Sequence, residues 1–166
     1  MADYMDTIRR VMEGDFADAS EEDRRQTTRE VVHICSVAAG AVAFQPIPFL
    51  DTVLISPIQV AMVQAIGRIY GHTLDQKSIL EMISTFGASI VAQNVIMAAA
   101  KFVPFAGWVA SMAMAYALTY AIGDVSEHYF RSDQAATDRE LREMFKSVYR
   151  QKKNEKVSEH RGNSSP

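Results

Sequence analysis

The side chains most able to do chemistry are scattered along this 166-residue chain. Its four histidines follow none of the paired spacings that hold a zinc ion on one helix. Glu127 and His128 are adjacent within an apolar segment, but neighbours on a helix point about 100° apart, so they cannot act together. The glycine-rich loop of P-loop hydrolases and the G-x-S-x-G turn of serine hydrolases are both absent. We therefore expect no enzyme activity, no metal ion and no cofactor.

The single cysteine and the net charge exclude two further classes of protein. Cys35 has no second cysteine to pair with, which excludes a disulfide framework and a cysteine-based zinc site and favours an intracellular protein. It lies in an apolar segment, where a cysteine typically acts as a small buried hydrophobe. A formal net charge of -3 argues against a whole-domain nucleic-acid partner, which needs a basic face.

Charge is concentrated at the two ends of the chain, and the centre is nearly free of it. Residues 1–31 carry nine acids and five bases, and residues 124–166 carry eight acids and nine bases. The centre is therefore either the core of a helical domain or a surface that meets a membrane. Residues 32–123 hold six charged side chains: Asp51, Arg68, Asp75, Lys77, Glu81 and Lys101.

Apolar residues recur with helical spacing, and no segment alternates like a strand, so we predict an all-α fold with five or six helices. Cap residues set the expected boundaries. We expect a short turn over 52–55 capped by Asp51, and helices over 3–13, 21–44 (capped by Ser20), 57–70 (begun by Pro57 and closed by Gly71), 76–102 (capped by Asp75), 108–130 and 138–155 (capped by Thr137). The expected units are an N-terminal helix and linker (1–19), a helical domain (20–157) and a disordered tail (158–166).

A central apolar antiparallel helical hairpin is predicted where the helices over 76–102 and 108–130 meet at a short connection containing proline and glycine. Small residues recur at every fourth position of the second helix, which lets another helix approach closely. We expect these positions, together with the adjacent tryptophan, to contact another helix or a membrane: Gly107, Trp108, Ser111, Ala115 and Thr119.

The run from Pro46 to Met62, the segment from Ile66 to Gly71 and the end of the hairpin at 115–123 resemble a bacterial GTPase-associated family, domain of unknown function 697 (YcjF-like). The resemblance covers about residues 25–131. Members often follow an Era-like GTPase domain or occur in inner-membrane proteins, which implies a GTPase partner in trans here. No catalytic residues are implied. The signature positions serve either as structural turn and cap residues or as partner contacts: Pro46, Pro48, Phe49, Asp51, Pro57, Gln59, Gly67 and Gly71.

Two interpretations of the apolar centre remain open. The uncharged stretches 31–50, 82–100 and 102–123 each approach the length that crosses a bilayer. Gln93 and Asn94 interrupt the second stretch, and the flanks show no strong positive-inside bias. A homo-oligomer or a partner protein would cover the same surface without a membrane. We expect a location in the cytoplasm or at the cytoplasmic face of the inner membrane.

The last helix carries a basic cluster beside its apolar face, and this cluster also allows two interpretations. A basic amphipathic helix can lie on anionic lipid, whereas a solvated helix would carry ion pairs such as Glu143–Lys146. The residues that would meet lipid headgroups are Lys146, Arg150, Lys152 and Lys153.

Three functional hypotheses follow from the sequence. The first is a non-catalytic helical interaction module at the inner membrane, with a GTPase or other protein partner. The second is a soluble homo-oligomeric adaptor, and the third is a carrier for an apolar ligand or a lipid.

Overall fold

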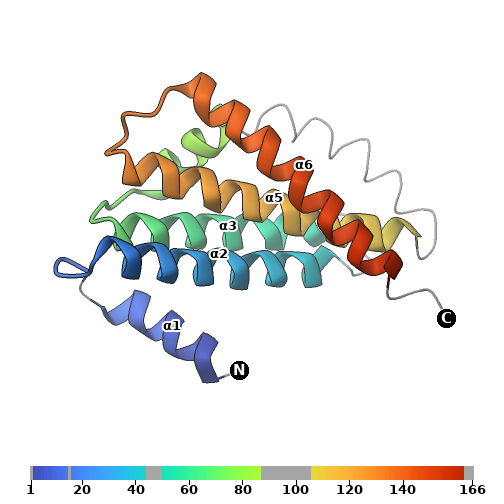
Figure 1. The fold of residues 1–166 in the computed structure, drawn as a ribbon, viewed down its shortest axis with the longest axis horizontal. Helices are drawn as coiled ribbons and strands as arrows, with labels where there is room; N and C mark the ends of the chain where they lie inside the picture. Colours follow the sequence, from blue (N-terminus) through green and yellow to red (C-terminus); the bar gives the residue numbers. More distant parts are fainter. Residues whose placement is uncertain (1, 15, 44–49, 87–105, 163–166) are drawn as a thin grey trace.

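The computed structural model describes the chain except residues 1, 15, 44–49, 87–105 and 163–166 (Figure 1). The elements are α1 (Ala2–Glu13), α2 (Glu21–Ala43), α3 (Leu50–Ile69), α5 (Ala106–Arg131) and α6 (Asp138–Gly162), with a further helical stretch over 76–86. The described residues contain no strand. The predicted all-α class is therefore confirmed.

Helix α5 lies at the centre of the molecule, packed against α2, α3 and α6 (Figure 1). Helix α2 also packs against α3, and the short α1 lies outside this pair, in contact with both. Small residues on α5 allow this crowding, because Ala113, Ala117 and Ala121 have no exposed surface at all. Larger side chains from α3, α5, α6 and the helical stretch over 76–86 fill the space around them: Phe86, Phe130, Phe145, Met62, Ile66, Ile69, Ile79 and Ile122.

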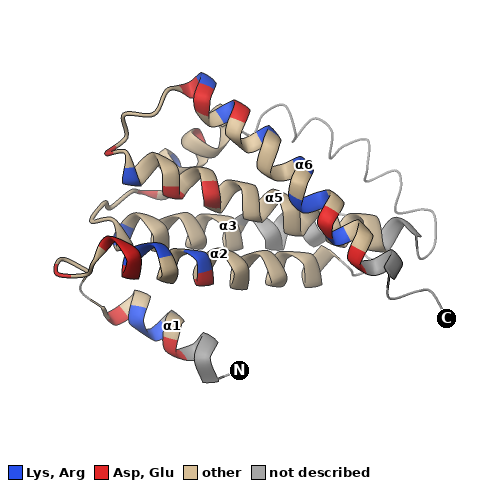
Figure 2. Cartoon of the chain, viewed as in Figure 1, with Lys and Arg blue, Asp and Glu red and all other residues tan. Residues whose placement is uncertain are grey.

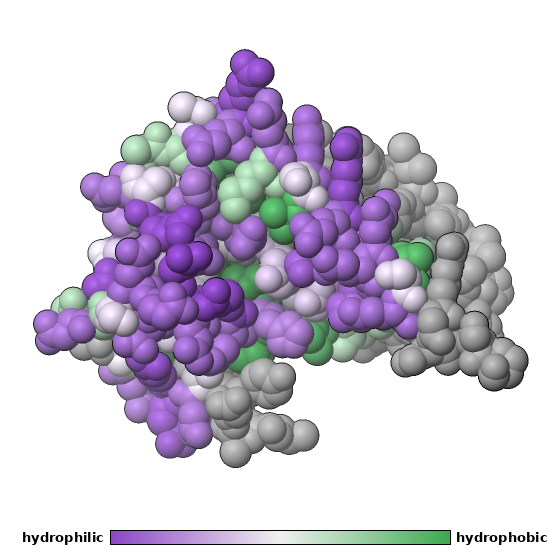
Figure 3. All heavy atoms as spheres, viewed as in Figure 1, coloured by the Kyte–Doolittle hydropathy of each residue, from purple (hydrophilic) through white to green (hydrophobic). Residues whose placement is uncertain are grey.

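The nearly uncharged centre is covered mainly by its own helices wherever the structure describes it. Charged residues gather on the early turns of α2, near the α3–76 connection and along α6 (Figure 2), and the face drawn in Figure 3 is mostly hydrophilic with small apolar patches. Three large apolar side chains of the described chain are exposed, namely Met12, Val37 and Leu80. In the described part, the centre forms the core of a helical domain, the first of the two interpretations that the sequence allowed, because α5 has helices on three sides.

Three of the predicted helix caps are confirmed. The Ser20 hydroxyl accepts a hydrogen bond from the backbone amide of Asp23 at 3.1 Å. The Asp75 carboxylate accepts one from the amide of Ser78 at 2.7 Å, and the Thr137 hydroxyl accepts one from the amide of Glu140 at 3.3 Å. Each bond satisfies a backbone donor that the first turn of a helix leaves without a partner.

Gly71 ends α3 as the sequence predicts. It has a φ of 80°, in the left-handed region where a side chain would be strained. The amide of His72 donates to the Gly67 carbonyl at 2.8 Å, and the amide of Gly71 donates to the Arg68 carbonyl at 3.0 Å. These two bonds form a Schellman motif, which satisfies the last carbonyls of the helix.

The predicted start of α3 is wrong. The sequence places a short turn after Asp51 and a new helix at Pro57, but α3 is continuous from Leu50 and holds Pro57 inside it. An internal proline removes one backbone hydrogen bond and costs about 3 kcal/mol. The packing of α3 against both α2 and α5 offsets that cost, and the cap pattern alone does not report this packing.

The predicted end of α6 is also wrong, because the helix continues past residue 155 to Gly162. Residues 158–162, expected to be part of a disordered tail, are helical. Ion pairs one turn apart support this extension: Lys152 with Glu155 at 2.8 Å and Lys156 with Glu159 at 2.7 Å.

The antiparallel hairpin stays a prediction. Helix α5 supplies its second helix, and the helical stretch over 76–86 begins its first. The connection and the rest of the first helix lie outside the described residues.

Candidate functional site

The signature residues that the structure describes serve mainly to pack helices. Gln59 on α3 is 8% exposed, and its amide nitrogen donates to the hydroxyl of fully buried Thr119 on α5 at 3.3 Å. Gly67 is buried, and a side chain there would meet the His72 carbonyl oxygen at 3.1 Å and the Phe130 ring at 3.6 Å. Gln59 and Gly67 thus allow α3 to lie close to α5.

The remaining signature positions in and before α3 are Pro57, Asp51, Pro46, Pro48 and Phe49. Pro57 is exposed within the helix, and Asp51 belongs to its first turn. Pro46, Pro48 and Phe49 lie outside the described residues. The structure therefore gives Gln59, Gly67 and Gly71 structural positions and does not test the others as partner contacts.

The predicted small-residue positions belong to α5, and those described face the interior of the molecule. Ser111, Ala115 and Thr119 are 8%, 7% and 0% exposed. Gly107 and Trp108 lie in the first turn of α5, and their surroundings are outside what the structure describes.

Two other glycines lie where α2 and α5 pack against each other. A Cβ atom on Gly123 of α5 would lie 2.5 Å from a methyl group of Val32 on α2. A Cβ atom on Gly40 of α2 would lie 3.4 Å from the Met112 carbonyl oxygen on α5. Gly40 lies in a run of small residues, a composition typical of close helix contacts. Gly123 continues the series of small residues at every fourth position of α5, but the predicted contact positions stopped at Thr119.

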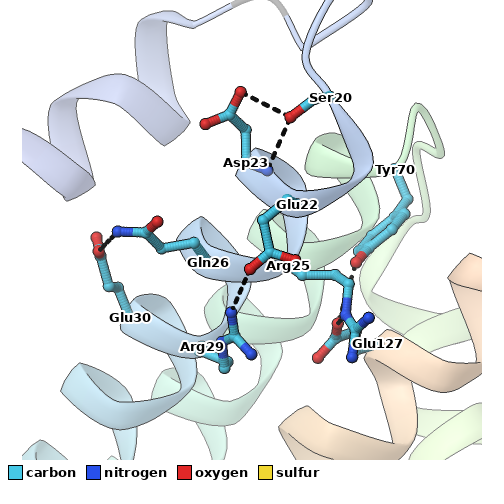
Figure 4. A network of polar contacts seen from close by, with 9 residues as sticks. All are labelled: Ser20, Glu22, Asp23, Arg25, Gln26, Arg29, Glu30, Tyr70 and Glu127. Carbon is cyan, nitrogen blue, oxygen red and sulfur yellow. Dashed lines mark hydrogen bonds and ion pairs between the residues drawn. The ribbon is translucent and has the colours of Figure 1, made fainter.

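A polar cluster joins the ends of α2, α3 and α5 (Figure 4). The Tyr70 hydroxyl donates to the Glu127 carboxylate at 3.1 Å, and the Arg25 guanidinium lies 4.0 Å from the same oxygen. Glu127 has only 13% of its side chain exposed, and this burial raises the pKa of its carboxyl group. Burial, and then the negative charge of Glu127, raise the pKa of Tyr70 to about 12.

The neighbouring polar side chains of α2 form contacts with one another in its first turns, and one of them attaches α1 to α2. Arg29 pairs with Glu22 at 2.9 Å, and the Gln26 amide donates to Glu30 at 3.2 Å (Figure 4). Thr7 of α1 donates its hydroxyl proton to Glu30 at 2.6 Å. Each of these contacts joins two residues of α2 or joins α1 to α2. No acid and base among these residues are therefore left open to a substrate.

Glu127 and His128 point to different helices, as their adjacency predicts. The His128 ring nitrogen lies 3.0 Å from the Glu140 carboxylate on α6, while Glu127 faces Tyr70 on the other side of α5. No cluster of three or more metal-binding side chains occurs in the described parts of the chain. Cys35 is half-buried, and burial raises the pKa of its thiol to about 11, which keeps the thiol protonated and unreactive near neutral pH.

The structure divides the basic cluster of α6 into two groups. The Lys152 ammonium lies 4.7 Å from the centre of the Tyr120 ring and is paired with Glu155, so it is directed at α5. Lys146 and Arg150 are exposed, and no ion pair or hydrogen bond of theirs occurs within the described chain. Lys153 lies 5.8 Å from the Tyr149 ring centre.

The ion pair expected between Glu143 and Lys146 does not form. Glu143 instead accepts a hydrogen bond from Arg139 at 3.2 Å. Lys146 is therefore left without the acidic partner that the sequence suggested.

None of the described helices is both long enough and apolar enough to cross a membrane. This finding does not cover residues 87–100, which make up most of the second uncharged stretch.

Comparison with known proteins identifies relatives but gives no catalytic residue. The sequence matches the family described as Domain of unknown function (DUF697) over residues 12–154. It is also 30% identical over 102 residues to Magnetosome membrane protein 22 of Magnetospirillum gryphiswaldense, covering 56% of this chain and 52% of that protein. The chain thus spans about half the length of this relative. No solved structure matches. Because the family match extends over most of the sequence, the chain belongs to the DUF697 family.

Proposed function

We propose that this protein is a non-catalytic helical interaction module that acts at the cytoplasmic face of a membrane with a GTPase partner in trans. The observation that carries the membrane part is the likeness to a protein named as a magnetosome membrane protein. Its likeness covers about half of each chain, so the activity and partners of that whole protein are not transferred.

The non-catalytic part is supported by what the polar side chains do. Glu127 is engaged with Tyr70 and Arg25, and His128 is engaged with Glu140. A general base must reach the proton of a substrate, and these groups already bind other helices of the same chain. Cys35, whose pKa is raised by burial, is equally unsuited to be a nucleophile.

The GTPase partner rests on the family resemblance. Members of this family often follow an Era-like GTPase domain, and the matched segment here occupies most of the sequence without a P-loop pattern.

Fractionation of cells that produce the full chain tests the membrane part of this proposal. We expect the protein in the membrane pellet and its release by a carbonate wash, because no described helix can span a bilayer. Recovery in the soluble fraction alone would contradict a role at the membrane. Co-purification of a GTPase after crosslinking tests the partner, with a helical protein of equal size as the control.

A homo-oligomeric adaptor is the second candidate, and the outer face of α2 favours it. Val37 is 50% exposed, and Ala41 one turn later is also exposed. An exposed apolar strip of this kind can dock a second copy of the chain. A molecular mass that rises with concentration in light scattering would support this candidate.

A further inference from the structure

The outer face of α6 presents three positive side chains in one line. Lys146, Arg150 and Lys153 are spaced by four and then three residues, so they lie on the same side of the helix within roughly 10 Å. We call these residues the α6 basic face. Figure 2 shows Lys and Arg recurring along α6, with acidic residues mainly toward its two ends.

The α6 basic face differs from the other charges of this helix because no carboxylate of the described chain forms an ion pair with it. Residues 144–154 contain four bases and no acid. Elsewhere on α6 each of three bases has an acidic partner: Arg139 with Glu143, Arg142 with Asp138 and Lys156 with Glu159. The charges of Lys146 and Arg150 are therefore not neutralised by neighbours in the described chain.

The inner side of α6 is occupied by contacts with the core of the molecule. Leu141, Phe145 and Tyr149 are 2%, 0% and 4% exposed because they pack into the core. The helix therefore has no free apolar side to insert among acyl chains. Any partner of the α6 basic face must be recognised through charge at the surface.

The surroundings of this face indicate the kind of partner. Ser147, Gln151 and Asn154 are the exposed residues between and beside the three bases, and none is apolar. The centre of a protein interface is typically aromatic or aliphatic, which this surface lacks. A layer of lipid headgroups attracts clustered Lys and Arg through charge alone.

We infer that the α6 basic face binds the phosphate headgroups of an anionic membrane surface. This inference deepens the proposed function and rests on it, because it names the surface and the lipid chemistry of the membrane contact. Each cation near such a surface increases partitioning by about fivefold. The three residues together are expected to contribute about a hundredfold.

Co-sedimentation of the full chain with vesicles tests the inference. We use phosphatidylcholine vesicles that contain phosphatidylglycerol, and pure phosphatidylcholine vesicles as the neutral surface. The wild type is expected to bind the anionic vesicles, to release them as salt is raised and to ignore the neutral ones. The variant Lys146→Gln/Arg150→Gln/Lys153→Gln is expected to bind about a hundredfold more weakly.

A control variant separates this face from net charge. Arg29→Gln/Arg68→Gln/Lys77→Gln removes the same number of positive charges from exposed positions outside α6. It is expected to bind anionic vesicles like the wild type. Both triple variants must show the helical circular dichroism of the wild type. Equal loss in the two variants, or full binding by the first, would overturn the inference.

Two further outcomes distinguish related explanations. Inorganic phosphate is compared with chloride at equal ionic strength, and selective release by phosphate would show a discrete phosphate site, which overturns a surface contact. If the wild type fractionates with membranes while the α6 variant still binds vesicles normally, the inference fails and the proposed function stands. If the wild type binds neither membranes nor vesicles, both fail.

Discussion

Asp124 and Glu127 lie one turn apart on α5, and each faces a different neighbouring helix. Glu127 meets Arg25 and Tyr70, whereas the positive charges that act on Asp124 include Lys152 and Arg131. Burial is nevertheless the largest influence on both carboxyl groups, and it raises the pKa of each. The core of this helix therefore holds ionised groups at some cost, which makes the stability of the fold depend on pH.

The sign of that dependence follows from the direction of the pKa shift. A carboxyl group whose pKa is raised on folding stabilises the native state at pH values below its ordinary value, 3.8 for Asp124, and this contribution is lost as the pH rises through the folded pKa. Asp75 behaves in the opposite way, because the amide of Ser78 lowers its pKa and its contribution is lost as the pH falls.

Replacing Asp124 by Asn is therefore predicted to favour the folded state progressively as the pH rises. An amide carries no charge that burial penalises. The free energy of unfolding of Asp124→Asn should therefore rise relative to that of the wild type between acidic and neutral pH. Urea unfolding at a series of pH values measures this difference. Asp18→Asn, at an exposed turn, is the control and should follow the wild type. Parallel curves for Asp124→Asn and the wild type would contradict the prediction.

Gly123 and Gly40 form a matched pair for testing the contact of α2 with α5. Alanine at position 123 would place its Cβ atom 2.5 and 2.9 Å from the two methyl groups of Val32, which cannot rotate away freely. We predict that Gly123→Ala lowers the free energy of unfolding by about 1–3 kcal/mol. Gly40→Ala meets only ordinary contacts, the nearest at 3.4 Å, and should be neutral or stabilising by about 0.5–1 kcal/mol. Urea unfolding compares them, and equal effects would contradict the assigned contact.

At the scale of elements, the sequence predicts those helix ends that are set by local hydrogen bonds. Ser20, Asp75 and Thr137 each accept a hydrogen bond from an amide three residues later, and Gly71 supplies a left-handed backbone. The local residue pattern is therefore sufficient to predict these helix ends. The start of α3 depends instead on packing between helices, which a cap pattern does not contain. The Glu127 cluster escaped prediction for the same reason, because Tyr70 lies 57 residues away in the sequence.

Pro57 tests where α3 begins. In a helix that starts at Leu50 the proline is internal, so Pro57→Ala restores a backbone hydrogen bond and should raise the free energy of unfolding by about 1–3 kcal/mol. In a helix that starts at Pro57 the ring suits the first position, and the same change should be neutral or destabilising. Ala61→Gly, an exposed change in the same helix, should cost about 1 kcal/mol and shows that unfolding reports on α3.

For the whole molecule, most apolar surface of the described chain is already buried between its own helices, so an outside partner has little left to cover. Val37 is one of three exceptions, and it is 50% exposed on a helix whose inner side is core. Ala41 continues the same strip. If this strip forms the interface of a homo-oligomer, a charge placed on it must weaken association and must leave folding intact.

Val37→Glu is predicted to separate these two properties. The side chain is half-exposed, so the free energy of unfolding should change by less than about 1 kcal/mol, whereas a buried charge at an interface costs far more. Light scattering of the full chain over a range of concentrations should then show monomer for the variant and a rising mass for the wild type. Gln76→Glu adds the same charge at an exposed helix start, where an acid is favourable, and should associate like the wild type. A rising mass for all three proteins would place any self-association on another surface, and a constant monomer mass for the wild type would remove the homo-oligomeric adaptor as a candidate.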